Sequence, residues 1–363
     1  MRSIFKSSVA AFLFFLIAVP ALAQQGIFNT VAESSISVGN AKRVIIPRQY
    51  NLVSANIPQL KNFLWSLPSE QDLPNFSSAP VMELPMPDGS TARFRVWESS
   101  IQEKPLEEKF PDIKTFAGQG IDDPYATIRM DFSPDFGFHA QILSVNGRIY
   151  IDPYARGNIN YYISYDQKDN FRNVSFSCET NADLEEELEG ATAAKMLAGP
   201  CRGTQLFTYR LAIACTGEYA QAVGAGTAAA LHAAIVTTVN RVTGVYEKEV
   251  AIRLILVGNN NLIEFLNPAT DPFNGNFNSG VLIAESQSVI TSNIGTGNFD
   301  IGHTFSTGGG GLAGLGVVCN PSQKARGITG SPVPVGDAYD IDYVAHEMGH
   351  QFGATHSFNS NGF

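Results

Sequence analysis

Three histidines close to the end of the sequence have the spacing of a metal site. His346 and His350 are four residues apart, so on a helix both imidazoles lie on one face and can reach the same ion. Glu347 would lie beside the ion on its open side, where a carboxylate can act as a general base. Gly353 permits the positive φ that ends a helix, and His356 then arrives as a third ligand. The pattern predicts a catalytic site for a single Zn²⁺ ion, with the fourth position left for water.

Two other interpretations of these histidines, a buried structural role and a structural zinc site, fit the pattern less well. Histidines on a helix are often only buried and hydrogen-bonded, but a chance match to the whole pattern is rare in a chain of 363 residues. A structural zinc site would normally have four protein ligands, usually including cysteine, whereas this pattern supplies three histidines. The expected metal ligands are therefore His346, His350 and His356, with Glu347 as the catalytic base.

The sequence before this motif alternates between strands and helices. Apolar side chains occupy every second position at 205–215, and every third or fourth position at 231–246. The expected elements are a half-buried strand at 205–215, a helix at 231–246, a strand at 251–257, a helix at 279–292 and a strand at 299–305. This order indicates an α/β sandwich. The glycine run at 308–311 is expected to be a flexible surface loop, because no Gly-Lys-Ser/Thr follows it.

The string from His346 to His356 is the pattern His-Glu-x-x-His-x-x-Gly-x-x-His of the metzincin metalloendopeptidases. Residues 204–363 resemble the catalytic domain of the reprolysin-like (adamalysin-type) group, particularly its secreted bacterial members. Further matches lie at 208–213, 237–242, 299–303 and 313–319. The resemblance implies an α/β (α+β) zincin-type domain with a twisted mixed sheet and an active-site helix. An edge strand of that sheet would pair antiparallel with a peptide substrate.

The same resemblance implies hydrolysis of peptide bonds in a protein or peptide substrate, by a zinc-activated water with Glu347 as the base. The alternatives are a zinc hydrolase that acts on another amide and a non-catalytic binding module, and the intact Glu347 weighs against the latter.

His303 falls on a strand that would border the cleft, but the ligand set is complete without it, so we expect a structural role. Metzincins have a methionine turn after the third histidine. No methionine follows His356, so the domain at 204–363 is expected to be C-terminally incomplete.

Residues 24–178 have the pattern of short strands separated by turns. A hairpin with a type I′ turn is expected at Asn146 and Gly147, between two alternating segments. No group of catalytic residues occurs in this half of the sequence. Together with the resemblance, this indicates a β-rich prodomain of a zymogen, a segment that serves folding or inhibition.

Residues 179–203 are rich in acidic and small residues. This composition predicts an exposed linker and processing region, and a short acidic helix around 183–189 is equally compatible with it. Lys195 and Arg202 are candidate cleavage points in this linker.

The four cysteines allow three pairings. A bond between Cys201 and Cys215 is disfavoured, because the strand at 205–215 carries the chain too far away to return. Cys215 is expected to be a buried thiol. Two interpretations of Cys178 stay open: an inhibitory zinc ligand in the zymogen, a device that some metzincins use, or an ordinary disulfide. Cys319 is expected to pair with another cysteine, in this chain or beyond its end.

The N-terminus and the charge indicate where the protein works. A basic start, an eleven-residue apolar run at 9–19 and Ala-Leu-Ala at 21–23 predict a secretory signal peptide at 1–23, because a membrane span needs about 20 apolar residues. We therefore expect a secreted, extracellular protein without a membrane span.

Nucleic acid is not an expected partner, because 24 basic against 34 acidic residues give a net charge of −10 and no basic cluster occurs. The sequence does not predict the oligomeric state.

Overall fold

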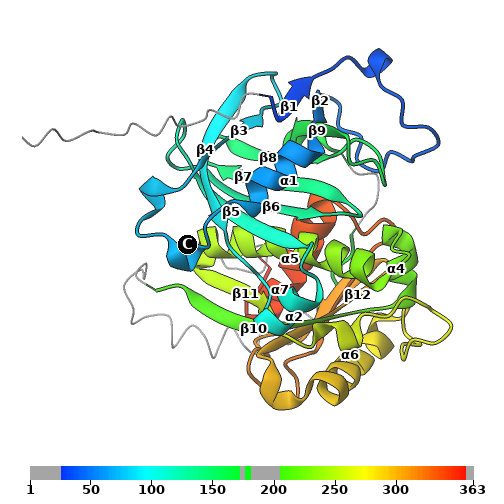
Figure 1. Cartoon of the computed structure of the whole chain (residues 1–363). Coiled ribbons are helices and arrows are strands. Elements are labelled where there is room, and N and C mark those ends of the chain that lie inside the picture. Colours follow the sequence, from blue (N-terminus) through cyan, green and yellow to red (C-terminus); the bar gives the residue numbers. More distant parts are fainter. Residues whose placement is uncertain (1–25, 172–175, 181–204, 357–363) are drawn as a thin grey trace, which may run out of the picture.

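The computed structural model describes residues 26–171, 176–180 and 205–356 (Figure 1). Within these ranges the strands form a nine-stranded sheet A, in the first half of the chain, and a five-stranded sheet B, in the second half. The chain is therefore of the mixed α/β type with a β-rich first half, as the sequence predicted. The predicted signal peptide at 1–23 and nearly all of the predicted linker, at 181–203, lie outside the described residues.

Sheet A is antiparallel throughout, in the order β1-β2-β9-β8-β7-β6-β5-β4-β3. Its strands are β1 (Phe28–Thr30), β2 (Asn51–Ala55), β3 (Val81–Pro85), β4 (Thr91–Glu98), β5 (Lys114–Gly120), β6 (Thr127–Ser133), β7 (Gly137–Ser144), β8 (Gly147–Pro153) and β9 (Tyr161–Asp166). Helix α1 (Ile57–Trp65) lies across one face and buries Leu60 and Leu64 in the shared core. Helix α2 (Lys104–Lys109) follows β4.

The predicted hairpin joins β7 to β8, but its turn differs from the prediction. Ser144 is paired with Gly147, so Val145 and Asn146 form the turn, and neither of them has a positive φ. A type I′ turn is therefore wrong here. The Ser144 hydroxyl accepts a hydrogen bond from the Asn146 N–H at 3.1 Å and donates to Asp123 at 2.5 Å, which holds a different local turn.

Sheet B has the order β11-β10-β12-β14-β13, and β13 alone is antiparallel to its neighbour. Its strands are β10 (Phe207–Cys215), β11 (Ile252–Leu256), β12 (Ile301–Ser306), β13 (Gly310–Ala313) and β14 (Gly327–Gly330). The helices of this half are α4 (Gly217–Val223), α5 (Ala228–Val250), α6 (Ser279–Ile294) and α7 (His346–Gln351), and a π-helical segment at Ala338–Ala345 leads into α7. The strands and helices predicted for 205–305 are confirmed.

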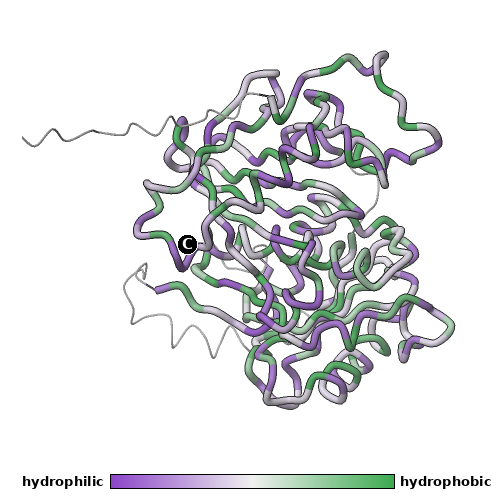
Figure 2. The backbone as a smooth tube through the Cα atoms, in the orientation of Figure 1, coloured by the Kyte–Doolittle hydropathy of each residue, from purple (hydrophilic) through white to green (hydrophobic). Residues whose placement is uncertain are grey.

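Helices cover both faces of sheet B. Leu211 and Ile213 of β10 pack in the core that α5 shares, while Ala212 and Ala214 face the core that α6 shares. The sequence predicted a half-buried strand from the strict alternation, and this is wrong for residues 211–215 of β10, which are buried on both faces. The alternation there separates large from small side chains on two covered faces. Hydrophobic and hydrophilic residues alternate along the chain throughout both halves (Figure 2).

The glycine run at 308–311 is not simply a surface loop. Gly310 and Gly311 begin β13, which pairs with β14 and forms the outer edge of sheet B. Glycine reduces strand propensity, so the sequence pattern gave no strand signal here. These glycines instead allow close approach of other groups, as the metal centre shows below.

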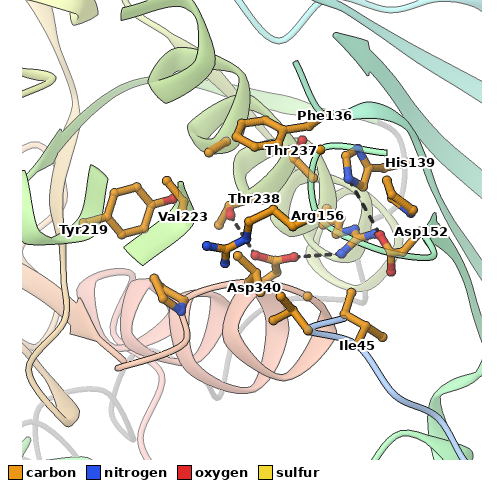
Figure 3. Close-up of a pocket in the computed structure, with 18 residues that line it drawn as sticks. Ile45, Phe136, His139, Asp152, Arg156, Tyr219, Val223, Thr237, Thr238 and Asp340 are labelled. Carbon is orange, nitrogen blue, oxygen red and sulfur yellow. Dashed lines mark hydrogen bonds and ion pairs between the residues drawn. The ribbon is translucent and has the colours of Figure 1, made fainter. Parts of the chain in front are cut away.

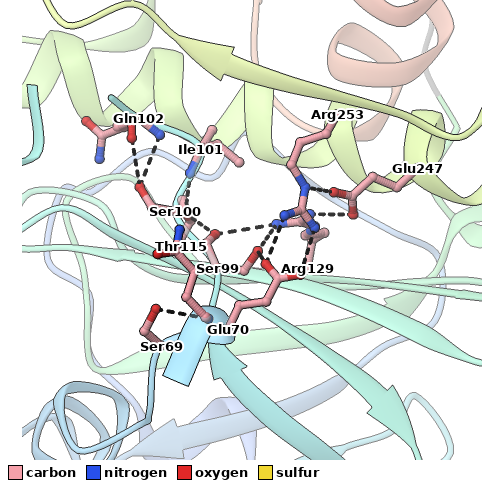
Figure 4. Close-up of polar contacts among 11 residues, drawn as sticks. Ser69, Glu70, Ser99, Ser100, Ile101, Gln102, Thr115, Arg129, Glu247 and Arg253 are labelled. Carbon is pink, nitrogen blue, oxygen red and sulfur yellow. Dashed lines mark hydrogen bonds and ion pairs between the residues drawn. The ribbon is translucent and has the colours of Figure 1, made fainter. Parts of the chain in front are cut away.

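Helix α5 lies between the two sheets and carries polar contacts that join them (Figure 1). Arg129 of β6 forms an ion pair with Glu247 of α5 (Figure 4). Arg253 of β11 binds the same Glu247 and also reaches Glu70 of the first half at 2.9 Å. These side chains are largely buried, so the two halves share one continuous interface.

The first half of the chain also borders both edges of sheet B. On the β11 edge, the Leu256 N–H donates to the Ile101 carbonyl at 2.7 Å, and the Glu103 N–H donates to the Leu256 carbonyl at 2.9 Å. On the β13 edge, Cys178 forms a parallel bridge with Gly311. Residues of the predicted prodomain therefore flank the sheet on its two sides.

Among the described residues, no single helix is long and apolar enough to cross a membrane. Helices α4 and α5 meet the length and composition only as a pair bent by 82°, and much of α5 is buried in the protein.

Candidate metal centre

Helix α7 and the turn after it bring the three predicted ligands together. The Nε2 atom of His346 lies 3.1 Å from that of His350 and 3.3 Å from that of His356. The Sγ atom of Cys178 lies 3.5 Å from the Nε2 atom of His350, and the four ligand atoms all lie within 4.8 Å of one another. The structure therefore adds a thiol to the three histidines.

These separations fit a tetrahedral zinc ion. With Zn–N bonds of about 2.0–2.1 Å and a Zn–S bond of about 2.3 Å, a tetrahedron places its nitrogens about 3.3 Å apart and its sulfur about 3.6 Å from each nitrogen. The observed distances of 3.1, 3.3 and 3.5 Å agree with this geometry to within a few tenths of an ångström. Imidazole and thiolate are also ligands that zinc prefers.

The turn after α7 orients the ligands. The Nδ1 atom of His350 lies 2.7 Å from the Ala354 carbonyl, so Nδ1–H donates there and leaves Nε2 for a metal. Gly353 has a φ of 98°, and its N–H donates to the His350 carbonyl at 2.8 Å. The positive φ predicted at Gly353 is confirmed, and it is what returns the chain to His356.

Glu347 is fully buried next to the ligands, beneath strand β13. A Cβ atom at Gly311 would collide with its carboxyl group, so the glycine makes the space for this side chain. Burial raises the pKa of Glu347 to about 8, although Cys178 and Thr180 lie close enough to oppose that rise.

Cys178 reaches the histidines because its neighbours pair with β13. The Gly311 N–H donates to the Ser177 carbonyl at 2.9 Å, and the Glu179 N–H donates to the Gly311 carbonyl at 2.8 Å. Burial raises the pKa of the Cys178 thiol to about 11, and the charge of Glu347 adds to this effect. A coordinated zinc ion would reverse it, because a thiol bound to zinc loses its proton.

The other cysteines behave only partly as expected. Cys215 is a free and fully buried thiol, as predicted, and burial raises its pKa well above the ordinary value. Cys178 and Cys319 form no disulfide within the described residues. Cys201 lies outside those residues, so the pairing predicted for Cys319 stays a prediction.

His303 takes a structural position in β12, as expected. Its ring is fully buried, with Nδ1 2.8 Å from the Gln351 side-chain oxygen and Nε2 2.8 Å from the Thr329 hydroxyl. The Gln351 amide in turn donates to the Gly302 carbonyl at 2.8 Å. Since that amide nitrogen donates, the Gln351 oxygen accepts from Nδ1–H, and this network ties α7 to sheet B.

A buried ion network, which the sequence did not predict, supports the segment before α7. Arg241 of α5 pairs with Asp340 of the π-helical segment at 3.0 Å and with Asp152 of β8. Thr238 donates to Asp340 at 2.7 Å. These residues line a hollow between the two halves, together with His139 and other side chains (Figure 3). None of the metal-cluster residues lines this hollow, which makes it a separate feature.

One comparison with known proteins agrees with the metal centre. Residues 206–363, slightly less than half of the chain, match the family described as metallo-peptidase family M12B, reprolysin-like, so this region is of the reprolysin-like type. The histidine cluster fits the zinc site of such a metallopeptidase. No curated protein matches the chain. One solved structure, titled "Structure of a chaperone-substrate complex", covers 37% of this chain and 97% of its own, at 9% identity and a TM-score of 0.25, too low to bear on the fold.

Proposed function

We propose that the protein is the secreted zymogen of a zinc metalloendopeptidase that hydrolyses peptide bonds. The proposal rests on one observation above all: three histidines with zinc-ligand separations lie beside the buried carboxyl group of Glu347, within a reprolysin-like region. The proposed parts are a signal peptide at 1–23, a β-rich prodomain at 24–178, a processing region at 179–203 and a catalytic domain at 204–363.

In this proposal His346, His350 and His356 hold the zinc ion. When bound, zinc acts as a Lewis acid that polarises the scissile carbonyl and lowers the pKa of water to about 7. Glu347 takes a proton from the attacking water on its carboxylate oxygen and later passes that proton to the leaving amine nitrogen. Its position favours this role, because the carboxyl group lies directly beside the three histidines, under Gly311 of the strand that the substrate would pair with.

We propose that a substrate strand pairs with β13, antiparallel to it. Gly311 offers one N–H and one carbonyl at this edge, and residues 177 and 179 occupy both of them in the chain as it stands. Residues 176–180 run parallel to β13, so their direction is opposite to that of the proposed substrate. A zinc ion held by the three histidines would meet a side chain of this segment, that of Cys178, rather than a peptide carbonyl. This arrangement supports a latent state in which Cys178 is the fourth zinc ligand.

The mechanism can be tested on the full chain after limited proteolysis within 181–203. About one zinc ion per chain is expected, and a chelator should abolish cleavage of an unmodified protein substrate. Glu347→Ala should keep the zinc and lower turnover by at least about 10²-fold, because the proton-transfer step loses its base. Glu249→Ala, at an exposed position of α5, is the matched control and should leave turnover unchanged.

Peptidase activity that survives in Glu347→Ala would contradict this role of the base. Turnover limited to non-peptide amides would identify a different hydrolase. Zinc binding without turnover of any amide would identify a non-catalytic binding module.

A further inference from the structure

The side chains of residues 176–180 alternate between two directions along β13. Phe176 and Cys178 are half-buried, whereas Ser177 and Glu179 are exposed. In an extended chain, alternate residues point to the same side. Phe176 therefore faces the metal-binding helix together with Cys178, two residues away from the thiol.

Phe176 rests on an aromatic surface next to the metal ligands. Its ring stacks on that of Tyr343, with the centroids 4.1 Å apart and the planes 14° from parallel. It also meets the ring of His346 edge-on, at 5.8 Å and 82°. The single ring of Phe176 therefore contacts both Tyr343 and a predicted metal ligand. The stacking surface is therefore adjacent to the proposed zinc ion.

Tyr343 is held in place from below by other rings. Its ring contacts that of Tyr339 edge-on at 6.5 Å, and Tyr339 contacts Phe305 of β12 at 5.8 Å. Tyr343 itself is only 6% exposed with Phe176 in place. One face of the Tyr343 ring is thus an aromatic platform, and the flat ring of Phe176 covers it in this chain.

We propose that Tyr343 determines substrate specificity, by stacking on an aromatic side chain of the substrate close to the scissile bond. This rests on the proposed peptidase function, because Phe176 must leave the platform before a substrate strand takes the β13 edge. Stacked aromatic pairs contribute enough beyond simple burial to change affinity by about two- to tenfold. The substrate class is therefore peptides with Phe, Tyr or Trp beside the bond that is cleaved.

The test uses the full chain carrying Phe176→Ala and Cys178→Ala after limited proteolysis within 181–203, so that neither side chain occupies the cleft and residues 176–180 can leave the β13 edge. A labelled peptide series places Phe, Leu or Ala at each of the two positions on either side of the scissile bond. Binding is measured by fluorescence anisotropy, and cleavage by its rate. At one position Phe should be favoured over Leu, which has a similar apolar size, by about two- to tenfold. Adding Tyr343→Ala should remove that preference, whereas Tyr343→Phe should keep it.

Zinc content and thermal unfolding show whether each variant is folded, and Tyr343→Leu replaces Tyr343→Ala if the smaller side chain does not fold. An aromatic preference that persists without the ring of Tyr343, or no preference at any position, would overturn the inference. Peptides that bind with the preference but are not cleaved would support the platform and contradict the proposed hydrolysis.

Discussion

Cys178 would differ from the histidines in its effect on a bound zinc ion, because it would fill the fourth ligand position. The histidines leave one tetrahedral position open, and the Cys178 sulfur lies at the distance from His350 that a fourth ligand would have. A thiolate in that position excludes water, and hydrolysis needs that water. The latent state would therefore depend on a single sulfur atom.

We expect Cys178→Ser to raise the peptidase activity of the unprocessed full chain at least about tenfold, because a neutral hydroxyl is a much weaker zinc ligand than a thiolate. The Co²⁺-loaded protein should also lose its sulfur-to-metal absorption band. Cys319→Ser, which changes an exposed thiol, is the control and should alter neither property. A Cys178→Ser chain that stays latent and keeps the band would contradict the assignment.

The residues of the site could be predicted to different degrees. His346, His350 and Glu347 follow from helical spacing, and Gly353 from its backbone freedom, since both are local properties of the sequence. Tyr343 and Gly311 had no such signal. Their roles arise because residues 176–180 pair with a strand more than a hundred residues later, and no local pattern encodes that pairing.

At the scale of elements, α7 is attached to sheet B through the neutral form of His303. Both ring nitrogens are used, one as a donor to Gln351 and the other as an acceptor from Thr329. Burial lowers the pKa of His303 to about 4, while an unfolded histidine has a pKa of about 6.5. The unfolded chain therefore takes up this proton more readily. The stability from neutral His303 is complete above about pH 6.5 and is lost as the pH falls towards 4.

We predict that protonation of His303 lowers the free energy of unfolding by about 3 kcal/mol as the pH falls from 6.5 to 4. His303→Gln cannot take up the proton, so this part of the pH dependence should disappear in the variant. Urea unfolding of the metal-free chain at several pH values measures the difference. Parallel pH profiles for the two proteins would show that His303 does not anchor α7 in this way.

The elements of the second half were easier to predict than those of the first. Helix α5 and strand β10 have long periodic patterns, and each packs where its apolar side chains indicate. Strands β13 and β14 were missed, because they are short and contain glycine at 310, 311, 327 and 330. For the first half, the sequence predicted only that it is β-rich. The order of its nine antiparallel strands was not predicted, since it depends on strand pairing rather than on composition.

At the scale of the whole molecule, the predicted prodomain is attached by more than its cysteine. Sheet A packs against α5, and the buried guanidinium of Arg241 is shared between Asp152 of sheet A and Asp340 of the segment that leads into α7. Arg241 is 2% exposed and Asp152 is 1% exposed at the side chain, so water cannot replace a lost partner easily. This ion pair links the position of sheet A to that of the metal helix.

Asp152→Ala should therefore weaken the proposed inhibitory assembly, although Asp152 lies outside the metal centre. Because Arg241 keeps Asp340, we expect a loss of roughly 2 kcal/mol rather than the larger cost of isolating a buried charge. Looser packing of sheet A should let Cys178 leave the metal more often, so its thiol should react faster with an alkylating reagent, as mass spectrometry of the Cys178 peptide would measure. Asp112→Ala is the matched control, because it breaks an exposed pair with Lys61 in the same half and exposed pairs contribute little. If Cys178 reacts no faster in Asp152→Ala than in Asp112→Ala, then the thiol is held by residues 176–180 alone, and the large interface with α5 serves folding rather than latency.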